Sequence, residues 1–138
     1  MCIRDRFGFV VPRFRPVRKD LPFTLISPSS SKRTNATFGG CEASNGTEIV
    51  EINPRDAEMC GFTDGDIAEV WNERGKVVLE IVVSDKTRPG VLYSPKGTWR
   101  DTSDTKLTVN SLIPSDIRAD LERGACYNET FVDLTLRV

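Results

Sequence analysis

The sequence predicts a mostly β domain with about two short helices, and three features indicate this fold class. Residues 48–52 and 130–138 alternate apolar with polar side chains, as half-buried strands do. Residues 67–71 and 76–84 are two further strand-like runs, and the Asn-Glu-Arg-Gly between them predicts a hairpin turn. Helix start and stop signals frame only two short segments, at 53–61 and 115–124.

The first predicted helix begins after Asn53 and ends before Gly61. Asparagine is a preferred N-cap residue, and Pro54 suits the first helical position. Gly61 can adopt the left-handed conformation of a C-terminal cap. The segment is therefore expected to form a helix of about two turns.

A tight turn is expected at Thr63-Asp64-Gly65-Asp66. Gly65 takes a positive φ at low cost, and aspartate side chains bond the local backbone. We therefore interpret Asp64 and Asp66 as turn-forming residues rather than as an acid pair.

The remaining elements are shorter, and two long loops separate them. In chain order we expect a first strand at 21–27 ended by Pro28, a short strand at 91–94, an extended segment at 107–110, a helix at 115–123 and a closing strand at 130–138. The loop between 28 and 47 is long for a compact domain and such loops are usually functional, with a surface loop that contacts nothing as the alternative. A second long loop lies between 95 and 106. The apolar residues expected to face the core or the helices that cover it include Val70, Val78, Ile81, Val83, Val132 and Leu134.

The composition excludes several classes of function. The 138-residue chain has a net charge of −1, which provides no long-range field for nucleic acids or acidic membranes. No apolar run approaches the roughly 20 residues that cross a bilayer. The sequence has no histidine, which excludes Ser-His-Asp catalysis and histidine-liganded metal sites within it. Its four cysteines form no Cys-x-x-Cys pair, and we interpret them as isolated thiols that suit a reducing compartment.

Residues 1–20 differ from the rest of the chain. They are basic, contain prolines and lack the long apolar core of a secretory signal. We interpret residues 1–20 as a linker or a non-native leader and residues 21–138 as the folded domain.

Six phrases in the sequence resemble one protein family and occur in the order found there: ISPSSSKRTNATFGG, INPRDAEMCGFTDGD, RGKV, RPGVLYSPKGTW, TVNSLIP and GACYNETFVDL. A helix followed by Gly-Phe-Thr-Asp-Gly-Asp resembles the Gly-Asp box of double-psi β-barrels. The ordered set resembles the C-terminal dinucleotide-binding domain of molybdopterin oxidoreductases over residues 21–138. The resemblance implies a double-psi β-barrel, although a second clear Gly-Asp box is not evident.

The resemblance also implies a cofactor, molybdopterin guanine dinucleotide carrying molybdenum or tungsten. A pyrophosphate is bound by cations, hydroxyls and backbone N–H groups, and base edges are bound by amides or carboxylates. In the family the loop after the first strand lies against the cofactor. The matching residues here are Ser29, Ser30, Ser31, Lys32, Arg33, Thr34, Asn35 and Thr37. Many relatives have a histidine in this region, where this chain has none.

Three further positions match residues that approach the cofactor in the family. Asn110 is one, with a backbone-capping turn residue as the alternative interpretation. Tyr127 and Asn128 are the others, for which a core aromatic beside a turn residue is an equal alternative. Lys96, Trp99 and Arg100 are interpreted as parts of a solvated loop.

The implied function is to bind this cofactor within a larger molybdenum or tungsten oxidoreductase. The metal ligand is expected outside this chain, which should have no catalytic residue and no activity alone. The expected partners are catalytic domains of the same or a separate polypeptide, with no nucleic acid and no membrane insertion. Alternatives are a free-standing small cofactor-binding subunit and a double-psi barrel that recognises proteins. The cytoplasm is favoured, and the periplasm is the alternative compartment.

Overall fold

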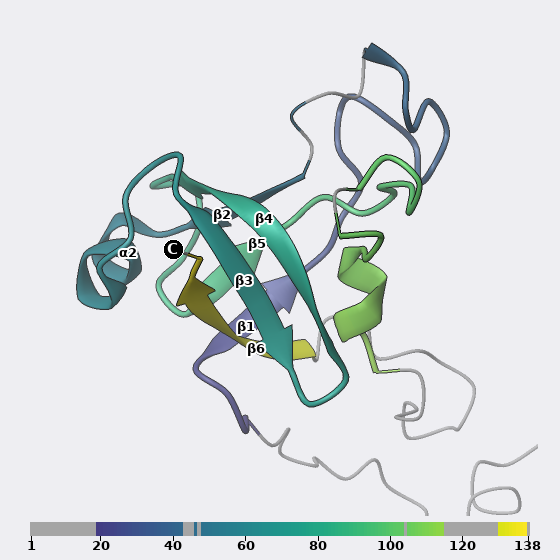
Figure 1. Ribbon diagram of the computed structural model, residues 1–138. Coiled ribbons are helices and arrows are strands. Elements are labelled where there is room, and N and C mark those ends of the chain that lie inside the picture. The colour runs from purple at the N-terminus through teal and green to yellow at the C-terminus, as the bar shows by residue number, and fades with distance from the viewer. Residues whose placement is uncertain (1–18, 43–45, 47, 104, 115–129, 138) are drawn as a thin grey trace, which may run out of the picture.

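The computed structural model of this chain describes residues 19–42, 46, 48–103, 105–114 and 130–137. Within these ranges, six strands form a closed barrel in the order β1-β5-β2-β4-β3-β6 (Figure 1). The strands are β1 (Phe23–Ile26), β2 (Ile49–Ile52), β3 (Ile67–Asn72), β4 (Gly75–Val83), β5 (Val91–Tyr93) and β6 (Thr130–Leu136). The mostly β prediction is confirmed, with strand ends that differ from the expected ones by a few residues.

The strand pairing combines parallel and antiparallel neighbours. Strands β1 and β5 are parallel, and so are β2 and β4. The β3–β4 hairpin and the β1–β6, β3–β6 and β2–β5 pairs are antiparallel and complete the barrel. Because both parallel pairs join strands distant in the sequence, the two halves interlock, and the fold is the predicted double-psi β-barrel.

The core consists of inward-facing side chains from every strand, together with Ala57, Phe62, Val109 and Leu112. Alternate residues of β4 are buried, with Val77, Leu79 and Ile81 at most 4% exposed. Of the two positions allowed for Val78, the core is excluded, because Val77 is the buried member of this pair and Val78 is half-buried. The hairpin register decides this, since it places Val77 opposite the buried Val70, and a one-residue shift would reverse the faces.

The other expected core residues lie as follows. Val132 is fully buried, whereas Val83 and Leu134 are partly buried and pack against the core. The alternation in β6 is lost beyond Leu134, and Leu136 is 45% exposed. The end of this strand therefore projects past the core.

Helix α2 (Pro54–Cys60) follows β2 and has the expected caps. The Asn53 side chain accepts a hydrogen bond from Arg55 N, and Gly61 has a φ of 76°. The acidic turn beyond it is also confirmed. The Asp64 side chain accepts from Val83 N at 2.8 Å, and the Asp66 side chain accepts from Thr63 N at 2.7 Å. Both aspartates therefore stabilise the backbone.

The expected extended segment at 107–110 is wrong in part, because the 3-10 helix η2 (Val109–Leu112) begins within it. Val109 and Leu112 are buried in this helix, and their spacing of three residues places them on one face. The anchoring of this face to the barrel favours the helix over an extended chain.

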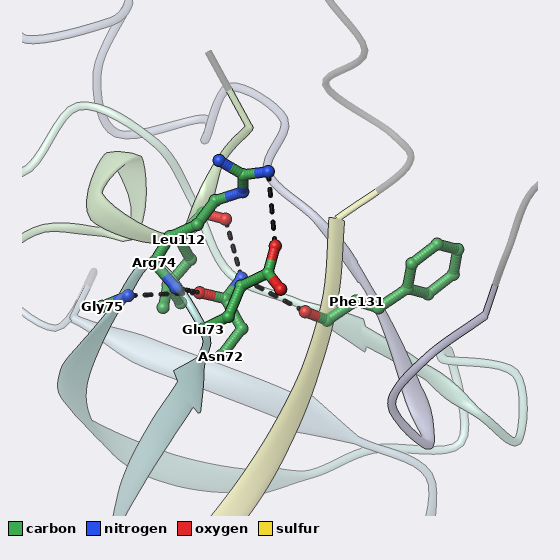
Figure 2. A network of polar contacts seen from close by, with 6 residues as sticks. All are labelled: Asn72, Glu73, Arg74, Gly75, Leu112 and Phe131. Atoms are coloured by element: carbon green, nitrogen blue, oxygen red, sulfur yellow. Dashed lines mark hydrogen bonds and ion pairs between the residues drawn. The ribbon is translucent and has the colours of Figure 1, made fainter. Parts of the chain in front are cut away.

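The β3–β4 turn is connected to η2 and β6 by one side chain, Asn72 (Figure 2). Its Nδ2 donates to the carbonyl oxygens of Leu112 at 2.8 Å and Phe131 at 3.2 Å. Its Oδ1 accepts from Arg74 N and Gly75 N within the turn. Asn72 therefore joins three elements that are far apart in the sequence.

Some predictions concern residues outside the described ranges. These are residues 1–18 of the linker or leader predicted at 1–20, the helix at 115–123, and the site residues Tyr127 and Asn128. Among the helices that the structure describes, none has the length and apolar character needed to span a membrane.

Candidate functional site

Two long loops lie together at one end of the barrel. The first loop (residues 28–42) follows β1, and the second loop (residues 95–106, with 104 not described) follows β5. Because β1 and β5 are parallel neighbours, the segments that follow them leave the barrel on the same side. Figure 1 shows both loops, and η2 next to the second, across the barrel from α2. The topology thus assembles the candidate site.

The two loops are joined by hydrogen bonds. At their base, Lys96 N donates to the Pro28 carbonyl oxygen at 3.0 Å. Farther out, the indole N–H of Trp99 donates to the carbonyl oxygen of Ala36 at 2.6 Å. These bonds span more than 60 residues of sequence and make the loops a single structural unit.

Two glycines allow the loops to approach so closely. A Cβ on Gly97 would overlap the carbonyl oxygen of Asn35, and Gly97 has a φ of +97°. A Cβ on Gly39 would overlap the indole ring of Trp99. The backbone of each loop therefore occupies space that a side chain on the other would need.

The interpretation of Trp99 as part of a solvated loop is only partly correct. Its side chain is 47% exposed, but its ring covers Gly39. Its carbonyl oxygen accepts from Thr102 N at 3.2 Å and Ser103 N at 3.0 Å, which fixes the turn that carries it. Arg100 is exposed, and its Nε donates to the carbonyl oxygen of Lys106 within the same loop.

Most of the site residues expected in the first loop lie at its surface. Ser30 is half-buried and accepts a hydrogen bond from Lys32 N at 3.3 Å. The exposed members are Ser29, Ser31, Lys32, Thr34, Asn35 and Thr37. Asn35 and Phe38 have positive φ values of 51° and 66°, and strained conformations of this kind cluster at functional sites.

Arg33, expected among the cofactor-binding residues of this loop, is only 5% exposed, whereas its neighbours Lys32 and Thr34 are exposed. Its Nη2 donates to the Thr98 hydroxyl at 2.8 Å, whereas its Nε is buried and has no hydrogen-bond partner among the described residues. Burial lowers the pKa of Arg33, and the negative charge of Glu48 opposes that shift. The guanidinium remains charged at neutral pH because arginine starts from a very high pKa. Arg33 thus links the two loops.

Asn110 lies in η2, and its position is controlled by the barrel. It is exposed, whereas its neighbour Val109 is buried. Asn72 holds the Leu112 end of the same helix (Figure 2). A Cβ on Gly75 would lie 3.0 Å from the Ser111 carbonyl oxygen, so the hairpin turn and η2 are in close contact. Asn110 therefore lies exposed on a 3-10 helix whose position is fixed by contacts with the β3–β4 turn.

Thr98, Trp99 and Gly97 were not identified as site residues from the sequence. A local signal was present, since a glycine within a long loop can mark close backbone approach. The missing information was the pairing of β1 with β5, which no single segment of the sequence encodes.

The exposed groups fit a phosphate-containing dinucleotide. The first loop offers a lysine, several hydroxyls and amide groups, which bind phosphate oxygens. Asn110 offers an amide that can both donate to and accept from a base edge. Within the described part of the chain, the buried Arg33 Nε is also a donor without a hydrogen-bond partner.

Comparison with known proteins identifies the family. The family model described as "Molydopterin dinucleotide binding domain" matches residues 23–131. The probable oxidoreductase YoaE of Bacillus subtilis (strain 168) is 33% identical over 126 residues, which cover 87% of this chain and 18% of that protein. Dimethyl sulfoxide reductase DmsA of Escherichia coli (strain K12) is 31% identical over 88 residues, covering 62% of this chain and 11% of that protein.

A solved structure shares the fold. Acetylene hydratase from Pelobacter acetylenicus superposes with a TM-score of 0.72 and 15% sequence identity, covering 97% of this chain and 22% of that one. This chain spans about a fifth or less of the length of the curated relatives and of this structure. With the sequence match over most of its length, the chain belongs to the molybdopterin dinucleotide-binding domain family.

Proposed function

We propose that the first loop and Asn110 bind the dinucleotide portion of a molybdopterin guanine dinucleotide, and that the chain works as the cofactor-binding domain of a larger oxidoreductase. The observation that carries this proposal is a cluster of exposed hydroxyls, amides and one lysine on the first loop. The backbone of this loop is held by a hydrogen bond from Trp99 of the second loop. Family membership supplies the cofactor class, and the loop supplies the chemistry to hold it.

The roles of the residues follow from their exposure. Lys32 provides an exposed positive charge for the pyrophosphate, and the hydroxyls of Ser29, Ser31 and Thr34 donate to phosphate oxygens. Asn110 binds a polar edge of the cofactor from the side of η2. When bound, the cofactor supplies the metal and the redox chemistry. This chain orients the cofactor and covers part of it.

The length of this chain relative to its relatives supports a second proposal, on where the metal ligand and the substrate site lie. Dimethyl sulfoxide reductase DmsA and the other curated relatives are several times longer than this chain. We therefore place the metal ligand and the substrate site on other domains or subunits. Under this proposal, the domain boundary lies near residue 20, where the basic, proline-containing segment of the sequence ends.

An NMR titration of the 138-residue chain with guanosine diphosphate tests the binding site. This probe carries the guanine and the pyrophosphate of the dinucleotide. We expect saturable shifts of the first-loop amides and of Asn110, with α2 unaffected as the internal control. Shifts confined to α2, or none at millimolar probe, would contradict the proposed site. In that case the protein-recognition alternative would be favoured.

A further inference from the structure

We propose that Arg33 and Trp99 are positioning residues that hold the first loop in its binding conformation by fastening it to the second loop. This inference rests on the proposed function of the first loop. It assigns the buried arginine a role different from that of the exposed lysine beside it, although the two cations are adjacent in the sequence.

The contact of Arg33 supports this role. The Nε atom is buried and Arg33 is only 5% exposed, so a ligand cannot reach this nitrogen unless the loops separate. Its Nη2 instead donates to the Thr98 hydroxyl at 2.8 Å. A hydrogen bond from a charged donor is stronger than a neutral one, and leaving a buried charge without its partner is costly. The Arg33–Thr98 pair therefore resists separation of the loops.

Trp99 provides a second, independent connection from the opposite loop. Its N–H donates to Ala36 O at 2.6 Å, and its ring covers Gly39. Ala36 O also accepts from Gly39 N at 3.1 Å in the turn of the first loop. The indole thus holds the same turn through a hydrogen bond and through packing. Asn35 and Phe38, with their positive φ values, lie within or next to this turn.

Thr98 offers a matched pair of variants that tests the inference. Thr98→Val preserves the shape of the side chain and removes the acceptor of the Arg33 bond, whereas Thr98→Ser preserves the hydroxyl. Trp99→Phe removes the indole N–H and keeps an aromatic ring over Gly39. Lys32→Gln removes the exposed charge and serves as the comparison for direct contact.

Two measurements on the full chain distinguish positioning from structural support. The first is hydrogen exchange at the amides of Thr37, Gly39 and Cys41, which form the first-loop turns, with β3 and β4 amides as the internal reference. The second is the dissociation constant for guanosine diphosphate and its dependence on salt.

We expect Thr98→Val and Trp99→Phe to raise exchange in the first loop about tenfold, although both substitutions lie in the second loop. The β3 and β4 amides should be unchanged. The same variants should weaken guanosine diphosphate binding several-fold without altering its salt dependence, and Thr98→Ser should restore both properties. Lys32→Gln should leave exchange unchanged, weaken binding and reduce the salt dependence, because it removes a charge that contacts the ligand.

The outcomes separate this inference from the proposed function. Unchanged first-loop exchange in both Thr98→Val and Trp99→Phe would overturn the positioning role, whatever the binding results. Altered exchange with unchanged probe affinity would also overturn it, since the loops would then be coupled without serving binding. If the parent chain and every variant fail to bind the probe, the proposed site is wrong, and the positioning role fails with it. Weaker binding in Lys32→Gln alone would support the site and contradict the positioning role.

Discussion

The carbonyl oxygen of Asn35 occupies the space that a side chain on Gly97 would fill. Both residues have positive φ values, 51° for Asn35 and 97° for Gly97, and they lie in loops that follow the parallel strands β1 and β5. This contact sets the distance between the two loops.

Gly97→Ala should destabilise the protein more than the same change at another glycine with a positive φ. At Gly97 the new methyl group overlaps a carbonyl oxygen of the backbone, in addition to the conformational cost. We expect a loss of about 2–4 kcal/mol, which combines positive-φ strain with a forced backbone shift. Urea unfolding of the full chain measures it.

Gly65→Ala is the matched control, because Gly65 has a φ of +87° but no atom of the described residues lies within 4 Å of the point that a Cβ would occupy. Its cost should be the conformational one alone, about 1 kcal/mol. Equal losses of stability in the two variants would show that the loops can separate freely and that the Asn35 contact is not restrictive.

Asn72→Ala should reduce stability by about 2–4 kcal/mol, since it removes several partly buried hydrogen bonds between the hairpin turn, η2 and β6. Glu73→Ala is the control in the same turn. The Glu73 side chain is 80% exposed, and its ion pair with Arg74 spans 3.3 Å at the surface, so its loss should cost less than about 0.5 kcal/mol. Thermal unfolding of the two variants compares them. A Tm for Asn72→Ala that matched the Glu73→Ala value would refute the bridging role.

Val77→Ala and Val78→Ala test the register of the β3–β4 hairpin. Val77 is 2% exposed and faces the core, so we expect its truncation to cost about 2 kcal/mol or more. Val78 is half-buried on the other face, and its truncation should cost less than half as much. Chemical denaturation measures both. A larger loss at Val78 would mean that the strand is paired one residue out of this register.

Cys60 should react slowly with alkylating reagents near neutral pH. Cys60 is exposed, but partial desolvation by its surroundings and the negative charges of Asp56 and Asp133 raise the pKa of its thiol. A raised pKa leaves a smaller thiolate fraction at pH 7, and the thiolate is the reactive form. Peptide mass spectrometry can follow the rate of Cys60 modification, with free cysteine as the reference. The rate at Cys60 should reach half its maximum at a higher pH than the rate for free cysteine. An identical pH profile for both thiols would disprove this environment.

Much of the barrel could be predicted from local sequence. Asn53, Gly61 and the Asp-Gly turn act through neighbouring backbone groups, so their roles can be read from a short segment. The face of β4 could not, because two adjacent valines satisfy either alternation, and only the pairing of Val70 with Val77 decides between them.

The candidate site was predictable only in part, for a related reason. Residue type identified the polar first loop and, with the family resemblance, its ligand class. Whether each side chain is exposed or buried depends on contacts with a loop more than 60 residues away. Arg33 shows this most clearly, since its neighbour Lys32 is exposed while Arg33 is buried against Thr98.

The most direct test of the cofactor-binding function is the pterin dinucleotide content of the assembled oxidoreductase that carries this domain. The triple variant Lys32→Gln, Thr34→Val, Asn110→Ala removes exposed groups from the first loop and η2. Since exposed substitutions usually change stability by less than about 0.5 kcal/mol each, the domain should unfold at nearly the parent temperature. We expect cofactor content per folded protein to fall about tenfold or more, because charge-assisted and amide hydrogen bonds are lost together. Full cofactor content in the folded triple variant would contradict the assignment of the site to this loop and Asn110.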